Sequence, residues 1–229
     1  LFCIYTGFWG FYAACNIPIF DLGPEYGLGD GVTFFTATNI YVTPTTLSGI
    51  TLNFLMSLAG GLLAGYWVSK GDPFWTYSGG LAGIITASAG NDLYHPIQSM
   101  LIGGFGTIIA YKLHYWVERK FKIDDAVGAV AVHGYAGVVG LIVCGFVLWG
   151  YPSSGYDGLG YAAINPVGMI IGAFIMFVVL GFIPGYVIAK ILHAAGKLRI
   201  PREVELAGLD YNIMEAASKD EKAVSSSNR

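Results

Sequence analysis

One ionisable side chain, His133, lies inside the apolar stretch AVAVHGYAGVVG, residues 129–140. It follows Asp125 by eight residues, and on an α-helix with a rise of about 1.5 Å per residue this places it roughly 12 Å from the helix start. If the stretch crosses a membrane, an imidazole at that depth is costly and typically marks a conduction path or proton relay. The alternative is a ring that only hydrogen-bonds to a neighbouring helix.

Three glycines accompany this histidine at three-residue spacing, Gly134, Gly137 and Gly140. They make the helix thin on and near the His133 face, so that another helix or a narrow conduit can come close. The other histidines, His95, His114 and His193, fall near predicted helix ends. We interpret these three as interfacial or solvated residues and not as ligands.

Other reactive groups do not form a catalytic pattern. The sequence contains no nucleophile elbow, phosphate loop, H-E-x-x-H or metal-ligating cluster, so we predict neither an enzyme nor a bound cofactor or metal. Cys3, Cys15 and Cys144 lack C-x-x-C spacing and are interpreted as buried small hydrophobic residues. Asp124 and Asp125 are predicted to be N-caps and helix-dipole partners.

Aromatic residues gather in GFWGF, where Phe8, Trp9 and Phe11 stand close together near the end of an apolar stretch. Two interpretations remain open. The rings form either an interfacial aromatic belt or a gate whose π faces attract a small cation.

The composition is that of an integral, all-α polytopic membrane protein. Hydrophobic residues make up 55% of the 229 residues, charged residues 12%, and the mean hydropathy is +0.60. The 33 glycines favour close helix packing within a bilayer. The net charge of −3 and the absence of a basic, aromatic-rich cluster argue against a nucleic-acid partner and leave the lipid bilayer as the predicted surroundings.

Six apolar stretches are long enough to span a bilayer of about 30 Å. We predict a transmembrane half-bundle over 1–194 and a polar cytoplasmic tail over 195–229, with a disordered serine-rich end. Because Leu1 starts an apolar stretch without a signal peptide, we expect the chain to begin inside a membrane helix of a longer protein. The six predicted spans are 1–19, 46–69, 74–90, 96–118, 126–150 and 163–194.

The basic residues predict the orientation. If six spans alternate, all Lys and Arg residues fall on or near one side, whereas the opposite loops carry only acidic charges. The positive-inside rule therefore places the carboxyl terminus in the cytoplasm. The acidic residues of the opposite loops are Asp21, Glu25, Asp30, Asp92 and Asp157.

The stretch KIDDAVGAVAVHGYAGVVG, residues 122–140, resembles the tenth-helix signature of the ammonium transporter family, the Amt/Mep/Rh proteins. In that signature a paired aspartate precedes V-H-G-x-x-G. GFWGF, SGGLAGIITASAG and LRIPREVELAGLD resemble the family's sixth helix, eighth helix and cytoplasmic tail, in the correct order. The resemblance implies the second inverted half-repeat, helices six to eleven, of an eleven-helix homotrimeric transporter in the plasma or inner membrane, whose missing amino-terminal half carries the first pore histidine.

The resemblance also implies a pore that conducts ammonia after ammonium loses its proton, with the proton transferred separately along the histidines. His133 matches the second histidine of the family's pair, and Phe11 matches the inner phenylalanine of its gate. The remaining pore positions are Ser88, where the family has threonine, Cys15, where many members have serine, and the apolar Ile4 and Ala129.

Two departures from the family pattern alter these expectations. The Cys15 thiol is a weak hydrogen-bonding group, which argues against a strong outer ammonium site. The tail has Tyr211, Asn212, Ile213 and Met214 where the family has H-G-E after G-L-D, which argues against a PII-type signal protein as partner. The alternatives to a transporter are an ammonium sensor of the same fold and a membrane scaffold that does not transport.

Overall fold

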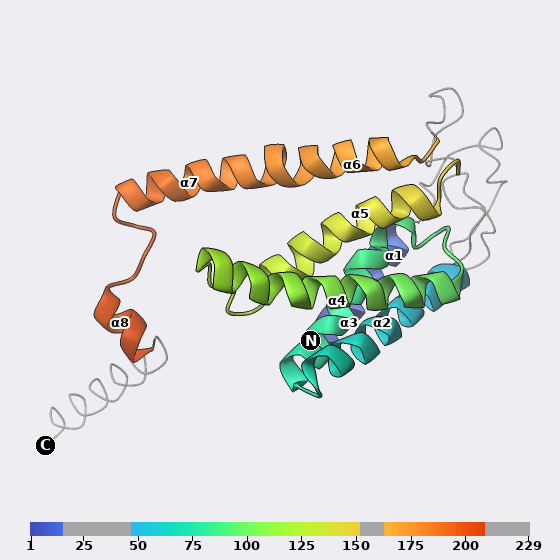
Figure 1. The fold of residues 1–229 in the computed structure, drawn as a ribbon, viewed down its shortest axis with the longest axis horizontal. Helices are drawn as coiled ribbons and strands as arrows, with labels where there is room; N and C mark the ends of the chain where they lie inside the picture. Colours follow the sequence, from blue (N-terminus) through green and yellow to red (C-terminus); the bar gives the residue numbers. More distant parts are fainter. Residues whose placement is uncertain (16–46, 152–162, 209–229) are drawn as a thin grey trace, which may run out of the picture. The chain divides into compact units, whose positions relative to one another are not determined.

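The computed structural model describes residues 1–15, 47–151 and 163–208, without the side chains of Ala14, Cys15 and Ala207. Every regular element within these ranges is a helix (Figure 1). The first elements are α1 (Phe2–Cys15), α2 (Leu47–Ser69), α3 (Pro73–Ala87), a 3₁₀ turn (Ser88–Gly90) and α4 (Pro96–Phe121). They are followed by a π-helical segment (Val130–Tyr135), α5 (Ala136–Val147), α6 (Pro166–Phe174), a second π-helical segment (Ile175–Phe182), α7 (Ile183–Ala194) and α8 (Arg202–Ala207).

Each of the six predicted spans contains a helix, and the prediction of an all-α membrane protein is confirmed. Among the described residues, three helical stretches are long and apolar enough to cross a membrane: Leu47–Ser69, Val130–Val147 and Pro166–Ala194. The helices α1 and α3 have 14 and 15 residues. The span predicted over 126–150 begins its helix later, because residues 122–128 form the connection from α4.

The chain forms two compact units, Leu1–Phe177 and Val178–Arg229. In the second unit the Phe182 ring stacks on Tyr186 with centroids 5.8 Å apart, and Lys190 Nζ lies 5.4 Å from the Tyr186 ring centre. Most apolar side chains of α7 are exposed, as expected of a helix that faces lipid. The predicted division into 1–194 and 195–229 stays a prediction, and the serine-rich end lies outside the described residues.

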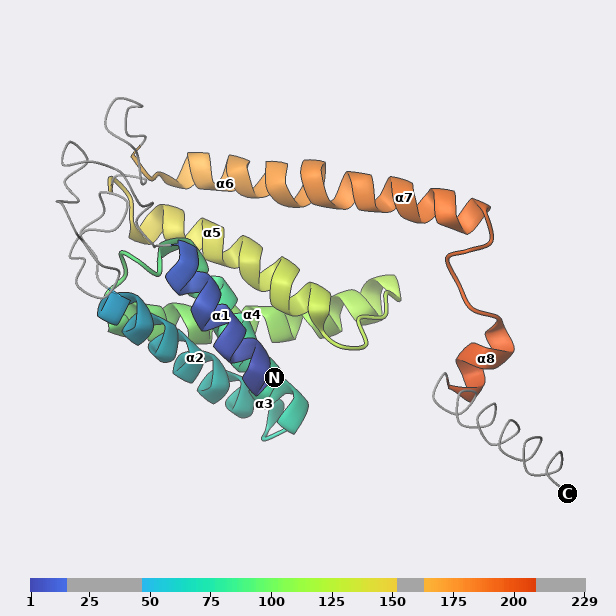
Figure 2. The same ribbon diagram turned by 180° about the vertical axis from the view of Figure 1, so that it is seen from behind.

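Glycines bring the backbones of α2, α3 and α4 into direct contact at the centre of the first unit (Figure 2). A Cβ at Gly60 would lie 2.0 Å from the Met100 carbonyl oxygen. At Gly61 it would lie 2.2 Å from the Gly79 carbonyl oxygen. Helix backbones this close require small residues at the crossing, so the glycine-rich composition produces a tight three-helix centre.

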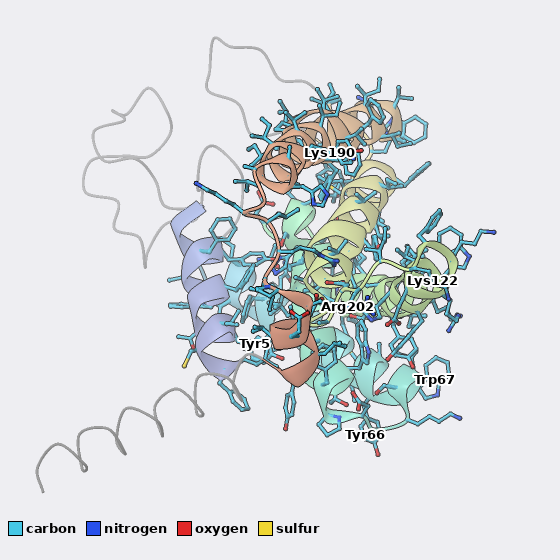
Figure 3. The ribbon with its side chains drawn as sticks, turned by 90° about the vertical axis from the view of Figure 1, so that its left-hand side faces the viewer. Tyr5, Tyr66, Trp67, Lys122, Lys190 and Arg202 are labelled. Atoms are coloured by element: carbon cyan, nitrogen blue, oxygen red, sulfur yellow. The ribbon has the colours of Figure 1, made fainter. Side chains whose placement is uncertain are left out.

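The connections of the first unit lie at two ends. The α2–α3 and α4–α5 connections lie at one end, and the α3–α4 connection lies at the other (Figures 1 and 2). Lys70 and Lys122 lie in the α2–α3 and α4–α5 connections. Figure 3 views the unit from this end. There Tyr66, Trp67 and Lys122 point away from the bundle (Figure 3). At the opposite end of the unit, the side chain of His95 caps the amino terminus of α4 by accepting a hydrogen bond from Ile97 N at 3.2 Å. This histidine was predicted to be interfacial or solvated.

Candidate functional site

A cavity of about 580 Å³ in the first unit brings together residues far apart in the sequence. Its walls come from α1, from α3 and the turn after it, and from the first π-helical segment together with α5. The second π-helical segment adds one ring. The lining residues are Phe8, Phe11, Tyr12, Ile85, Ser88, Ala89, Asn91, Asp92, His133, Gly137, Leu141 and Phe177.

His133 lies in the π-helical segment and faces this cavity. Its ring stacks on Phe8 with centroids 6.4 Å apart and planes inclined by 27°. Phe8 in turn meets Phe11 edge to face at 6.2 Å. Single π-helical turns within α-helices are frequent at functional sites because they turn side chains out of the regular register. The histidine, the predicted gate residue Phe11 and the neighbouring Phe8 therefore form one continuous group of rings.

The glycines beside His133 have separate roles. A Cβ at Gly140 would lie 2.3 Å from the Thr86 carbonyl oxygen, so this glycine lets α5 pack directly on α3. A Cβ at Gly137 would lie 3.0 Å from Phe177 Cζ, so Gly137 leaves space for that ring. The glycine face beside His133, predicted to allow close approach, is thus contacted by both a helix and an aromatic side chain. Phe177 had no distinguishing sequence signal, because it lies in an uninterrupted apolar stretch.

Ser88 is held at the cavity wall by Tyr12. The Ser88 hydroxyl donates to the Ile84 carbonyl at 3.0 Å, and the Tyr12 hydroxyl contacts both of these groups. Tyr12 is buried, whereas Ser88 is exposed to the cavity. The tyrosine is a positioning residue that we did not predict, since its place in GFWGFY resembles that of any apolar core residue.

The remaining predicted pore residues lie elsewhere or outside the description. Ile4 and Ala129 are exposed and are not among the described residues that line the cavity. The side chain of Cys15 lies outside the described residues. Within the aromatic group, Trp9 Nε1 donates to Thr51 Oγ1 at 3.1 Å and so binds α1 to α2. Only the phenylalanines of this group line the cavity.

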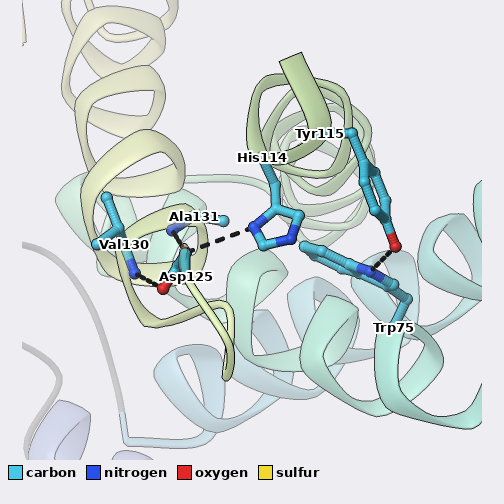
Figure 4. A network of polar contacts seen from close by, with 6 residues as sticks. All are labelled: Trp75, His114, Tyr115, Asp125, Val130 and Ala131. Atoms are coloured by element: carbon cyan, nitrogen blue, oxygen red, sulfur yellow. Dashed lines mark hydrogen bonds and ion pairs between the residues drawn. The ribbon is translucent and has the colours of Figure 1, made fainter. Parts of the chain in front are cut away.

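Asp125 supports the segment that carries His133. Its two carboxylate oxygens accept hydrogen bonds from Val130 N at 3.1 Å and from Ala131 N at 3.0 Å (Figure 4). This satisfies backbone donors that a helix start otherwise leaves without partners. Asp125 therefore caps the first backbone N–H groups of the segment as predicted for a capping side chain, although the residue at the N-cap position itself is Ala129.

His114, which we predicted to be interfacial or solvated, is packed between helices in the structure. Its Nδ1 lies 3.4 Å from Asp125 Oδ2, and its side chain is only 10% exposed. The ring meets Trp75 at 5.0 Å, and Trp75 Nε1 donates to the Tyr115 hydroxyl at 2.9 Å (Figure 4). Aromatic packing between α3 and α4 therefore holds the histidine against the capping aspartate.

Replacing Asp125 with alanine is expected to lower the stability of the protein by about 1–2 kcal/mol, because two backbone donors lose their acceptor. Thermal unfolding of the purified protein in detergent measures the effect. The matched control is Asp124→Ala, since Asp124 is exposed and makes no described side-chain hydrogen bond. Equal melting temperatures for the two variants would contradict the capping role.

Comparison with known proteins identifies the family. Residues 26–218 match the model described as the Ammonium Transporter Family. The chain belongs to the ammonium transporter family. The matched range contains the Ser88, Asp92, His133 and Phe177 parts of the cavity, and α1 lies before it. As a member of this family with long apolar helices, the chain is an integral membrane protein.

Curated members of the ammonium transporter family are similar to nearly the whole chain. Ammonium transporter Amt1 of Methanocaldococcus jannaschii is 30% identical over 203 residues, which are 89% of this chain and 47% of the relative. Ammonium transporter Amt2 of the same organism is 37% identical over 83% of this chain and 40% of its own length. The chain spans half or less of the length of these relatives, in agreement with a sequence equivalent to the second half of a family member.

Proposed function

We propose that the complete protein transports ammonium, and that the cavity around His133 forms one wall of its conduction path. The observation that carries this proposal is the continuous group of His133, Phe8 and Phe11 rings within one cavity. The names of the relatives support the substrate. In this proposal Ser88, Cys15, Ile4 and Ala129 also line the path, with Ile4 and Ala129 outside this cavity.

The lining residues favour ammonia over a permanent cation. The faces of Phe8 and Phe11 attract a small cation, but the apolar Ile85, Leu141 and Phe177 cannot replace the water around it. Ammonium can pass this region by releasing its proton, and the His133 imidazole offers a nitrogen for hydrogen bonding to the neutral ammonia. The released proton travels separately, and His133 is one candidate carrier. Potassium has no proton to release.

The proposal extends to the assembly. A preceding half of the same protein supplies the remaining pore wall and a partner histidine, and three subunits associate, each with its own pore. The carboxyl terminus lies in the cytoplasm, as the predicted distribution of Lys and Arg indicates. A PII-type partner is disfavoured by residues 211–214, which lie outside the described residues.

Uptake of radiolabelled methylammonium tests the function. The complete protein encoded by the gene is expressed in cells that lack their own ammonium transporters. We expect saturable uptake that ammonium inhibits and that an equal concentration of potassium leaves unchanged. Ammonium binding without uptake would favour a sensor, and the absence of both would favour a scaffold.

A further inference from the structure

A carboxylate, Asp92, lines the same cavity as His133. It belongs to the turn between the 3₁₀ segment Ser88–Gly90 and α4, at the end of the unit opposite Lys70 and Lys122. The residue is partly buried. A charged group in the wall of an apolar cavity needs a compensating partner or a function.

The turn that bears Asp92 is firmly held. Asn53 of α2 donates from Nδ2 to the Asn91 and Tyr94 carbonyls, at 2.7 Å each. Leu93 N donates to the Gly90 carbonyl at 2.9 Å. Because Asn53 is buried within the three-helix centre, packing holds the backbone of the turn that carries Asp92.

Among the described residues, no basic side chain forms an ion pair with Asp92. The structure places no Lys, Arg or His of the described ranges within ion-pair distance of it. The sequence of the three loops predicted on this side contains no Lys or Arg, and the Nδ1 of its single histidine, His95, already accepts from Ile97 N. Burial raises the pKa of the Asp92 carboxyl above its usual value by desolvating the charged form. A nearby cation would offset that penalty.

A second candidate acceptor belongs to the neighbouring residue Asn91. Asn91 lines the cavity, is 2% exposed, and has an Oδ1 without a hydrogen-bond donor among the described residues. Buried acceptors of this kind are usually satisfied. A small cation with several N–H groups could donate to these oxygens.

We propose that Asp92 attracts and holds ammonium in the cavity before ammonium reaches the rings of Phe8 and His133. The inference rests on the proposed transport function and adds a specificity-determining residue to it. Asp92 lowers the ammonium concentration that is needed to occupy the conduction path. It takes no part in the later release of the proton.

The test compares concentration dependences of methylammonium uptake by the complete protein. In Asp92→Asn the apparent KM is expected to rise about tenfold, equivalent to about 1.4 kcal/mol of binding, with the maximal rate within about twofold. Asp92→Glu should retain a KM near that of the unsubstituted protein. Asp92→Ser is measured in parallel, so that a folding failure of the asparagine variant leaves a second neutral variant.

The matched control is Asp72→Asn. Asp72 is exposed at the other end of the unit and caps α3, and asparagine retains that cap. Raised ionic strength should increase the KM of the unsubstituted protein more than that of Asp92→Asn, because salt screens the attraction. An unchanged KM in both neutral variants, with uptake intact, overturns this inference alone. Absence of uptake by the unsubstituted protein overturns the proposed function itself.

Discussion

Replacing His133 with alanine is expected to reduce methylammonium uptake by the complete protein about tenfold or more. The substitution removes the cavity's imidazole, and in the proposed pore ammonia then loses a hydrogen-bond partner, at a cost of about 1–3 kcal/mol. The stacked contact with Phe8 at 6.4 Å is lost as well. Initial uptake rates, normalised to the amount of protein in the membrane, measure the effect.

The matched control for this variant is His193→Ala. His193 is an exposed residue of α7 and does not line the cavity, so its removal should leave uptake within about twofold. Normal uptake by His133→Ala would overturn the conduction role and leave His133 as a packing residue. Loss of uptake in both variants would likewise count against a role specific to the cavity.

Replacing Gly60 with alanine is expected to destabilise the protein by about 3 kcal/mol, the upper part of the range for overpacked cores. The new Cβ would lie 2.0 Å from the Met100 carbonyl oxygen. Since that atom belongs to the backbone, no side-chain rotation relieves the clash, and α2 must move away from α4. Thermal unfolding in detergent, followed by size-exclusion chromatography, measures the loss.

The graded control is Gly104→Ala at the same helix pair. A Cβ at Gly104 would lie 3.3 Å from the Gly60 carbonyl oxygen, which requires a shift of only a few tenths of an ångström. Its melting temperature should fall much less than that of Gly60→Ala. Similar losses for both variants would show that the α2–α4 contact is not as close as the structure has it.

Sequence reasoning predicted the helical class and the positions of the spans, and three of its six predicted pore residues, His133, Phe11 and Ser88, line one cavity. Each span is an uninterrupted apolar stretch, and inside a bilayer such a stretch must pair its backbone groups within a helix. The GFWGF and V-H-G stretches were informative because an aromatic cluster and a lone imidazole are unusual among Ala, Val and Gly. The capping role of Asp125 followed from its place just before an apolar helix.

The residues that we missed have ordinary local surroundings. Phe177 and Tyr12 lie in apolar stretches where nothing in the sequence separates a cavity-lining ring from a lipid-facing one. His114 was interpreted as interfacial because its neighbours are aromatic, yet Trp75 of another helix buries it. Asp92 was only one of several acidic loop residues until Asn53 was seen to hold its turn against the cavity.

The pattern of apolar and basic residues was sufficient to establish a helical membrane protein, because the bilayer restricts backbone conformation strongly and hydropathy reports that restriction directly. Which residues line the cavity was decided by the packing of segments that are distant in the sequence. Gly60, Gly137 and Gly140 set how near the helices and rings approach. The two π-helical segments shift side chains out of the α-helical register, so a period of about 3.6 residues could not predict that His133 and Phe177 face the same space.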